Sequence, residues 1–143
     1  MRVVETSMVQ GDSRSTAAGP TVRRVVLLLG AIVVSLAVAS ALHLSGHVHG
    51  RGAPFDADHA GVAEALIGVV LAAAAIGLGR SGLRARRLAL WATGFAIAGF
   101  CWGLSITAQA GHWPDIGYHL VVLPLLVVSF AALLRVGRVA SGP

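Results

Sequence analysis

The chain has 143 residues, of which 56% are apolar and only 12% are charged, and its mean hydropathy is +0.80. Soluble domains carry about 25% charged residues, so this composition excludes a soluble globular domain and excludes disorder over most of the chain. Cys101 is the single cysteine, which excludes a disulfide within one chain. The basic residues are 11 arginines that lie between apolar runs, without interleaved aromatic residues, so they do not indicate nucleic-acid binding.

Four apolar runs follow one another along the chain, at residues 25–46, 60–79, 88–110 and 118–134. A hydrocarbon core of ~30 Å needs about 20 helical residues, and backbone in lipid must satisfy its own hydrogen bonds. We therefore predict an all-α integral membrane protein with four transmembrane helices in an antiparallel up-down bundle. Residues 1–24 and 135–143 are predicted to be tails, the first of them flexible.

The arginines predict the orientation of this bundle. Ten of the eleven lie before the first run, between the second and third, or after the fourth, and only Arg51 lies in another loop. The positive-inside rule makes that side cytoplasmic. Both termini are then cytoplasmic, loops 47–59 and 111–117 face outside, and the plasma (inner) membrane is the expected location. Trp91, Trp113 and Tyr118 suit the two membrane interfaces.

The first run has an alternative interpretation. Arg23 and Arg24 followed by an apolar stretch that ends Ala37-Val38-Ala39 is also typical of a cleaved signal peptide. The apolar stretch 25–42 has 18 residues, longer than the ~7–15 of a signal peptide, which favours an uncleaved helix. Cleavage would leave three spans.

Small residues predict where helices approach one another. Gly99 and Gly103 form a GxxxG pair in the third run, a pattern that lets helix backbones come close in lipid. The pair predicts packing within the chain or, alternatively, a homodimer or a contact with a larger membrane complex. Pro124 is expected to kink the fourth helix, and Cys101 to be an inert buried thiol.

All the histidines lie on the predicted outer side, at positions 43, 47, 49, 59, 112 and 119. Neutral imidazole is the commonest transition-metal ligand, and His43 and His47 would share one face of a continuing helix. We therefore predict a possible outward-facing Cu or Zn site formed by His43, His47, His49, His59 and His119, with Asp58 or Glu64 assisting. Haem b is the less favoured cofactor, since only His43 with His119 or His59 would suit it.

Structural roles are the alternative for these outer residues. Asp56, Asp58 and Asp115 stand just before predicted helices, where aspartate caps free N–H groups. A protonated His47 would suit a helix C-terminus. The order Gly-His, Pro, Asp, His recurs in both outer loops, which is compatible with duplication of a two-helix unit.

Glu64 is the single acid within a predicted span, and an intramembrane acid is a functional hypothesis by default. It lies five residues after His59, on a different helix face, so its partner must come from another helix. His43 and Gln109 are the candidates.

No catalytic motif is recognisable in the sequence, so an enzyme is not expected. The most specific functional hypothesis is outward-facing transition-metal binding. The alternatives are an accessory or scaffold subunit of a larger membrane complex and a proton-coupled carrier that uses Glu64.

Overall fold

The computed structural model describes residues 19–48, 51–52 and 54–139, and these are almost entirely helical, which confirms the predicted class. His49 and the ends of both predicted tails lie outside the described residues. The elements, in chain order, are α1 (Pro20–Leu44), β1 (Arg51–Gly52), β2 (Phe55–Asp56), α2 (Ala57–Ser81), the 3-10 helix η1 (Gly82–Ala85), α3 (Arg86–Ala110) and α4 (Trp113–Val139).

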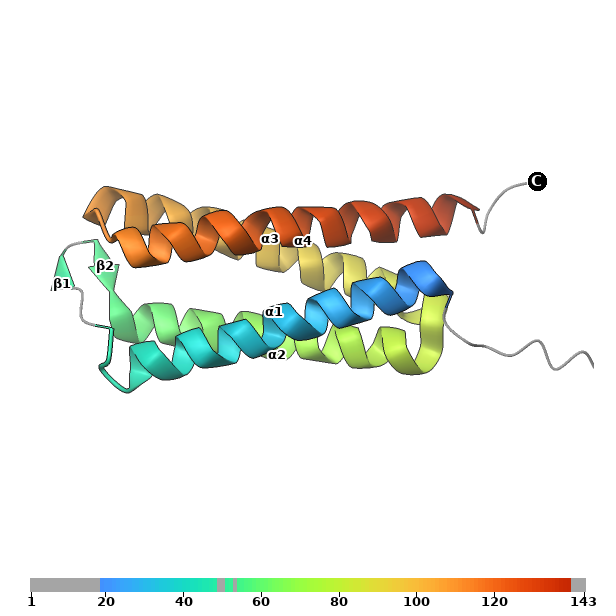
Figure 1. The fold of residues 1–143 in the computed structure, drawn as a ribbon, viewed down its shortest axis with the longest axis horizontal. Helices are drawn as coiled ribbons and strands as arrows, with labels where there is room; N and C mark the ends of the chain where they lie inside the picture. Colours follow the sequence, from blue (N-terminus) through green and yellow to red (C-terminus); the bar gives the residue numbers. More distant parts are fainter. Residues whose placement is uncertain (1–18, 49–50, 53, 140–143) are drawn as a thin grey trace, which may run out of the picture.

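The α-helices lie side by side, and each runs antiparallel to the one before it (Figure 1). The most extensive packing joins α1 to α2 and α3 to α4. One end of the bundle holds the start of α1, the η1 turn and the end of α4; we call it the arginine end. The other end holds the β1–β2 hairpin and the turn between α3 and α4; we call it the hairpin end (Figure 1).

Hydropathy located the apolar part of each helix but not the ends. Helix α1 begins at Pro20, because proline is favoured in the first turn of a helix. Helix α4 begins at Trp113 and continues through Pro124 to Val139, well beyond the apolar run 118–134. Helix α1 ends at Leu44, and the φ of +71° at Gly46 turns the chain aside. His43 and His47 therefore do not share a helix face, as they would have done on a continuing helix.

The core between the helices is made of branched side chains from α1, α2 and α4 and mostly small side chains from α3. Fully buried leucine and isoleucine come from α1, α2 and α4, whereas α3 contributes three alanines, Ala89, Ala92 and Ala96, together with Phe100. The fully buried leucine and isoleucine residues that centre this core are Leu29, Ile32, Leu36, Leu71, Leu78, Leu126 and Leu133.

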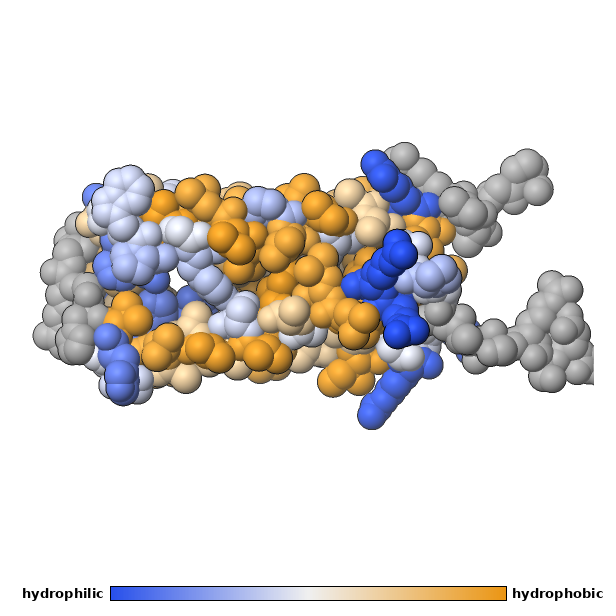
Figure 2. All heavy atoms as spheres, viewed as in Figure 1, coloured by the Kyte–Doolittle hydropathy of each residue, from blue (hydrophilic) through white to orange (hydrophobic). Residues whose placement is uncertain are grey.

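The outer surface of the bundle is apolar along its length. Large side chains such as Trp91, Val69 and Leu27 are exposed, and hydrophobic residues cover the middle of the face in Figure 2, with the most hydrophilic ones near the ends. Three helical segments of the described chain are long and apolar enough to cross a membrane: Pro20–Leu44, Ala57–Ala110 and Trp113–Val136. The second of these includes α2, η1 and α3. The molecule is therefore compatible with a location in a membrane.

Candidate functional site

A close approach of α1 and α2 builds the first part of a polar site at the hairpin end. Gly61 makes this approach possible, because a Cβ there would lie 2.9 Å from Leu44 Cγ and 3.0 Å from His43 Cβ. The Ser40 hydroxyl donates a hydrogen bond to the Gly61 carbonyl oxygen at 2.8 Å and holds the two helices together. Glu64, one turn further along α2, is thereby placed against His43 of α1.

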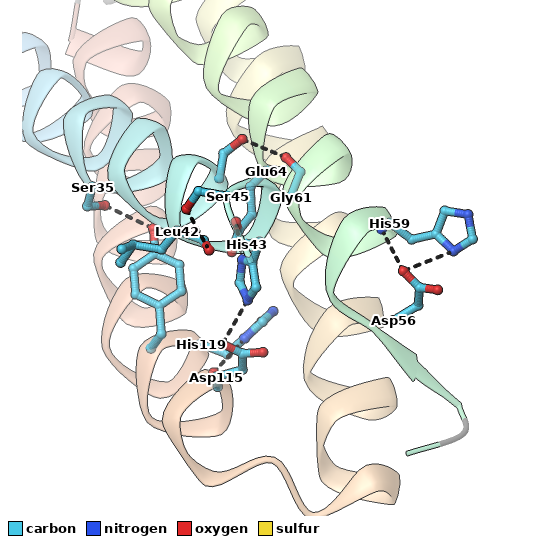
Figure 3. Close-up of polar contacts among 12 residues, drawn as sticks. Ser35, Leu42, His43, Ser45, Asp56, His59, Gly61, Glu64, Asp115 and His119 are labelled. Atoms are coloured by element: carbon cyan, nitrogen blue, oxygen red, sulfur yellow. Dashed lines mark hydrogen bonds and ion pairs between the residues drawn. The ribbon is translucent and has the colours of Figure 1, made fainter. Parts of the chain in front are cut away.

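Four titratable side chains from α1, α2 and the start of α4 form a continuous series, which we call the acid–imidazole chain: Glu64, His43, Asp115 and His112 (Figure 3 labels the first three). His43 Nδ1 lies 2.8 Å from Glu64 Oε2, and His43 Nε2 lies 3.3 Å from Asp115 Oδ1. His112 Nδ1 lies 2.9 Å from Asp115 Oδ2. His43, Glu64 and Asp115 are all buried, at 3%, 8% and 7% exposure.

One atom of this chain is left without a hydrogen bond. His43 Nε2 lies 3.3 Å from Asp115 Oδ1, but the geometry of this contact makes no hydrogen bond. Among the described residues, this nitrogen is the one buried side-chain N or O atom without a hydrogen-bond partner. An unsatisfied buried polar group costs about 1–3 kcal/mol. Each of the two ring nitrogens of His43 faces a carboxyl group, so this side chain joins the two acids.

Phe55 of β2 covers the acid–imidazole chain at the hairpin end. Its ring is 5% exposed and stacks on His112, with centroids 4.7 Å apart and planes 13° from parallel. It meets the His43 ring edge-on at 6.1 Å. The short hairpin therefore separates the buried imidazoles from solvent.

His119 lies between α3 and α4, next to the acid–imidazole chain, but it makes no hydrogen bond with a carboxyl side chain of that series. Its Nδ1–H donates to the backbone carbonyl of Asp115 at 2.7 Å, since a carbonyl can only accept, and its ring packs on Phe100 at 5.0 Å. The ring occupies the space that the missing side chain of Gly103 leaves, and a Cβ on Gly99 would lie 2.7 Å from Ile67 Cδ1. Both glycines of the GxxxG pair are thus packed within the chain.

A cavity of about 360 Å³ adjoins the acid–imidazole chain. Glu64, Asp115 and His119 form its polar end, and side chains from α2 and α3, among them Ile67 and Phe95, form its apolar wall. Known small-molecule sites span ~300–1,000 Å³, so the cavity is of a size that holds a small ligand.

The structure brings together some of the predicted metal ligands and separates others. His43, Glu64 and His119 lie at or beside the cavity, and the exposed His59 lies at its edge. His47 and Asp58 are exposed and do not line it, and His49 lies outside the described residues. The His59 side chain, which is 88% exposed, points away from the acid–imidazole chain and lies beside Asp56 (Figure 3). Among the described residues, no group of three or more His, Cys, Asp and Glu side chains is arranged to hold a metal ion.

The structure confirms one predicted partner of Glu64 and one predicted helix cap, and it places the other candidates differently. Of the two candidates for Glu64, His43 is its partner, while Gln109 donates to the carbonyl of Ser105. Asp56 caps α2 by accepting from the N–H of His59, as predicted. Asp115 is not placed before α4 but inside its first turn, with its side chain on His112 and His43.

The sequence alone did not indicate that His112, Asp115 and Phe55 belong to one site. His112 directly precedes α4, where its carbonyl accepts from the Ile116 N–H, and Asp115 lies in the first turn of that helix. Their closeness becomes readable once α4 is known to begin at Trp113. Nothing in the local sequence indicates that Phe55 covers them.

Comparison of the chain with protein-family models, with curated proteins and with solved structures gives no match. The function is therefore inferred from the site alone.

Proposed function

We propose that the chain crosses the plasma membrane four times, with both termini in the cytoplasm and the hairpin end outside. Helices α2 and α3 have 25 residues each, about 37 Å at ~1.5 Å per residue, which is enough for each to span a core of ~30 Å. The described arginine side chains lie at the arginine end, at positions 23, 24, 80, 84, 86, 87 and 135. This asymmetry supports the proposed orientation.

Cysteine labelling tests the topology with a matched pair. Ser45 and Ser81 are exposed serines at the hairpin end and the arginine end. In a Cys101→Ala background, Ser45→Cys should react with a membrane-impermeant thiol reagent on intact cells, and Ser81→Cys only after permeabilisation. If only Ser81→Cys reacted on intact cells, the protein would have the opposite orientation to the one proposed.

We infer that the hairpin end takes up and releases protons through Glu64, as the outer half of a proton-coupled carrier. The observation that carries this proposal is the series of two carboxyl and two imidazole groups beside the cavity, of which Glu64, His43 and Asp115 are buried. Groups in such contact share protons and titrate as a set. A buried intramembrane acid with a histidine partner is also typical of proton relays in pumps and transporters.

The carrier proposal requires a second conformation. In the structure the cavity lies toward the hairpin end, and the inner half of the bundle is filled by Leu29, Leu71, Leu78 and Leu133. Release toward the cytoplasm would therefore require these side chains to separate, or a second copy of the chain to complete the path.

Difference infrared spectroscopy tests the protonation of Glu64 without knowledge of the ligand. A protonated carboxyl group gives a C=O band that a carboxylate lacks. In the purified chain in lipid, this band should grow as the pH is lowered from about 8 to about 5, and Glu64→Gln should remove its major part. Asp58→Asn, at an exposed position of the same helix, is the control and should leave the band unchanged. A band that does not vary with pH would refute the proposal.

Transition-metal handling is the second candidate, favoured by one observation, the buried His43 Nε2 that has no hydrogen-bond partner and faces Asp115. A Cu or Zn ion would need further ligands from side chains that move toward this pair. Metal analysis of the purified wild type against His43→Ala and against His47→Ala/His49→Ala tests it. Stoichiometric metal that is lost in a variant supports this candidate, and trace metal in every sample ends it.

A role as an accessory or scaffold subunit has weaker support. It was predicted from the small-residue faces, and Gly99 and Gly103 are covered inside the chain. A partner or a second copy would have to dock on the exposed apolar surfaces instead. Cross-linking in detergent extracts tests this candidate.

A further inference from the structure

The cavity beside Glu64 opens through the side of the bundle. Leu66 of α2 and Phe95 and Trp102 of α3 line it, and they are 57%, 46% and 71% exposed. Side chains that line a cavity and are also exposed on an apolar surface mark its mouth. In a four-span protein this mouth, between α2 and α3, faces lipid rather than water, so a ligand that dissolves in the membrane reaches the cavity directly.

The wall of the cavity is aromatic. Phe95, Phe100 and Trp102 of α3 line one side, and Ile67 of α2 lines the other. Aromatic faces carry a negative electrostatic potential, so besides burying an apolar body they attract a cation, by about 0.5–2 kcal/mol for each well-placed ring.

The polar end of the cavity presents carboxylates and hydrogen-bond acceptors. Asp56, Glu64 and Asp115 line it together with His59 and His119, and none of the described lining residues is an arginine. The Thr107 hydroxyl, which also lines the cavity, donates its hydrogen to the Gly103 and Leu104 carbonyls, so its oxygen remains an acceptor. The His119 Nδ1–H is used by the Asp115 carbonyl, which makes Nε2 an acceptor in the neutral ring.

This combination selects a ligand by charge. A carboxylate or phosphate would meet like charge at Glu64 and Asp115. His43 contacts one oxygen of Glu64, Oε2, and a neutral hydrocarbon would offer nothing to the rest of that carboxyl group. A zwitterionic lipid headgroup would bring its phosphate against the same carboxylates. A free molecule with one positive group and an apolar body satisfies both ends of the cavity.

We propose that this cavity binds amphiphilic organic cations, such as amines or quaternary ammonium compounds with an aromatic or alkyl body, which enter from the outer leaflet between α2 and α3. Glu64 is the counter-charge, and Phe95, Phe100 and Trp102 enclose the body. The inference deepens the proposed function: a cation that binds a protonated Glu64 displaces its proton, so cation and proton compete for one carboxylate.

Binding of a matched pair of probes tests the proposal. The first probe is a phenylalkyl-trimethylammonium ion, and the second is its uncharged analogue in which carbon replaces the nitrogen. Calorimetry on the full chain in lipid nanodiscs should show that the cation binds at least ~10-fold more tightly than the analogue, and more tightly at about pH 8 than at about pH 5. Saturating zwitterionic lipid should not displace it.

Variants separate the site from the fold. Glu64→Gln should reduce the preference for the cation to within about threefold, whereas Glu64→Asp, which keeps the charge, should retain a measurable preference. Asp58→Asn, which lies outside the cavity, should bind as the wild type does. Trp102→Leu, at an exposed position, should weaken both probes without unfolding the chain. Equal binding of the two probes by the wild type, or an undiminished preference in Glu64→Gln, would overturn the proposal.

The failure of this inference is distinguishable from the failure of the proposed function. If the infrared band of Glu64 varies with pH but the two probes bind equally, the proton site stands and the ligand class is wrong. If the cation binds through Glu64 but the band does not vary, the ligand class stands and the proton link is wrong.

Discussion

Substitution of Gly61 by alanine should both destabilise the bundle and separate His43 from Glu64. The added Cβ would lie 2.9 Å from Leu44 Cγ and 3.0 Å from His43 Cβ, whereas carbon atoms in favourable contact are ~3.5–4.0 Å apart. Helices α1 and α2 must therefore move apart by roughly 0.6–1 Å. The His43–Glu64 contact of 2.8 Å would then exceed the ~3.2 Å limit of an ordinary hydrogen bond.

The expected cost of Gly61→Ala is about 1–3 kcal/mol of unfolding free energy, the usual range for overpacking. Part of this is offset by the higher helix propensity of alanine, worth up to ~1 kcal/mol. Gly79→Ala is the matched control, since it lies on the same helix and a Cβ there meets nothing within 4 Å. It should be neutral or stabilising.

Unfolding by a denaturing detergent, followed by far-ultraviolet circular dichroism, measures both variants in lipid–detergent micelles. The infrared band of Glu64 reports the second effect, because a carboxyl group that loses His43 changes its pH response. If Gly61→Ala were as stable as Gly79→Ala and left the Glu64 band unchanged, the close approach of α1 and α2 would not be what positions the acid–imidazole chain.

Three further predictions concern single contacts. His43→Ala should lower the unfolding free energy by about 2–4 kcal/mol at about pH 8 and by less at about pH 5, where Glu64, which the variant leaves without its histidine partner, takes up a proton; equal losses in detergent unfolding at both pH values would contradict this. Gly103→Ala should push the His119 ring into the cavity and weaken binding of both probes, whereas Gly30→Ala, where a Cβ meets nothing within 4 Å, should not. Arg86→Gln should cost about 1–2 kcal/mol, since Arg86 donates to the carbonyls of Leu133 and Leu134 at 2.7 and 3.3 Å; a loss no greater than that of the exposed control Arg87→Gln would show that this tie is unimportant.

Much of the fold was predictable because lipid leaves few options for the backbone. Long apolar runs require helices, and the runs at 25–46, 60–79, 88–110 and 118–134 lie within α1 to α4, apart from the last two residues of the first. The partner of Glu64 was predictable for a geometric reason, since helix periodicity excluded His59 and left a residue of another helix at similar depth. His43 fulfils that expectation.

The composition of the site was less predictable, because it depends on where helices end. An α1 that ends at Leu44 removes His47 from the face of His43. An α4 that begins at Trp113 places His112 directly before the helix and Asp115 in its first turn, where the two side chains meet. The periodicity of apolar residues does not indicate at which polar residue a helix begins or ends. Strands of two residues such as β1 and β2 have no periodicity at all, so the position of Phe55 over the imidazoles could come only from tertiary structure.

The central claim is that Glu64, His43, Asp115 and His112 share protons as one unit. The most direct measurement is a pH titration by nuclear magnetic resonance of the side-chain carboxyl carbon of Glu64 and the ring nitrogens of His43 in lipid. The account predicts that both signals change over the same pH interval and that Glu64→Gln shifts the titration of His43. Signals that stay constant, or that titrate independently of each other, would contradict it.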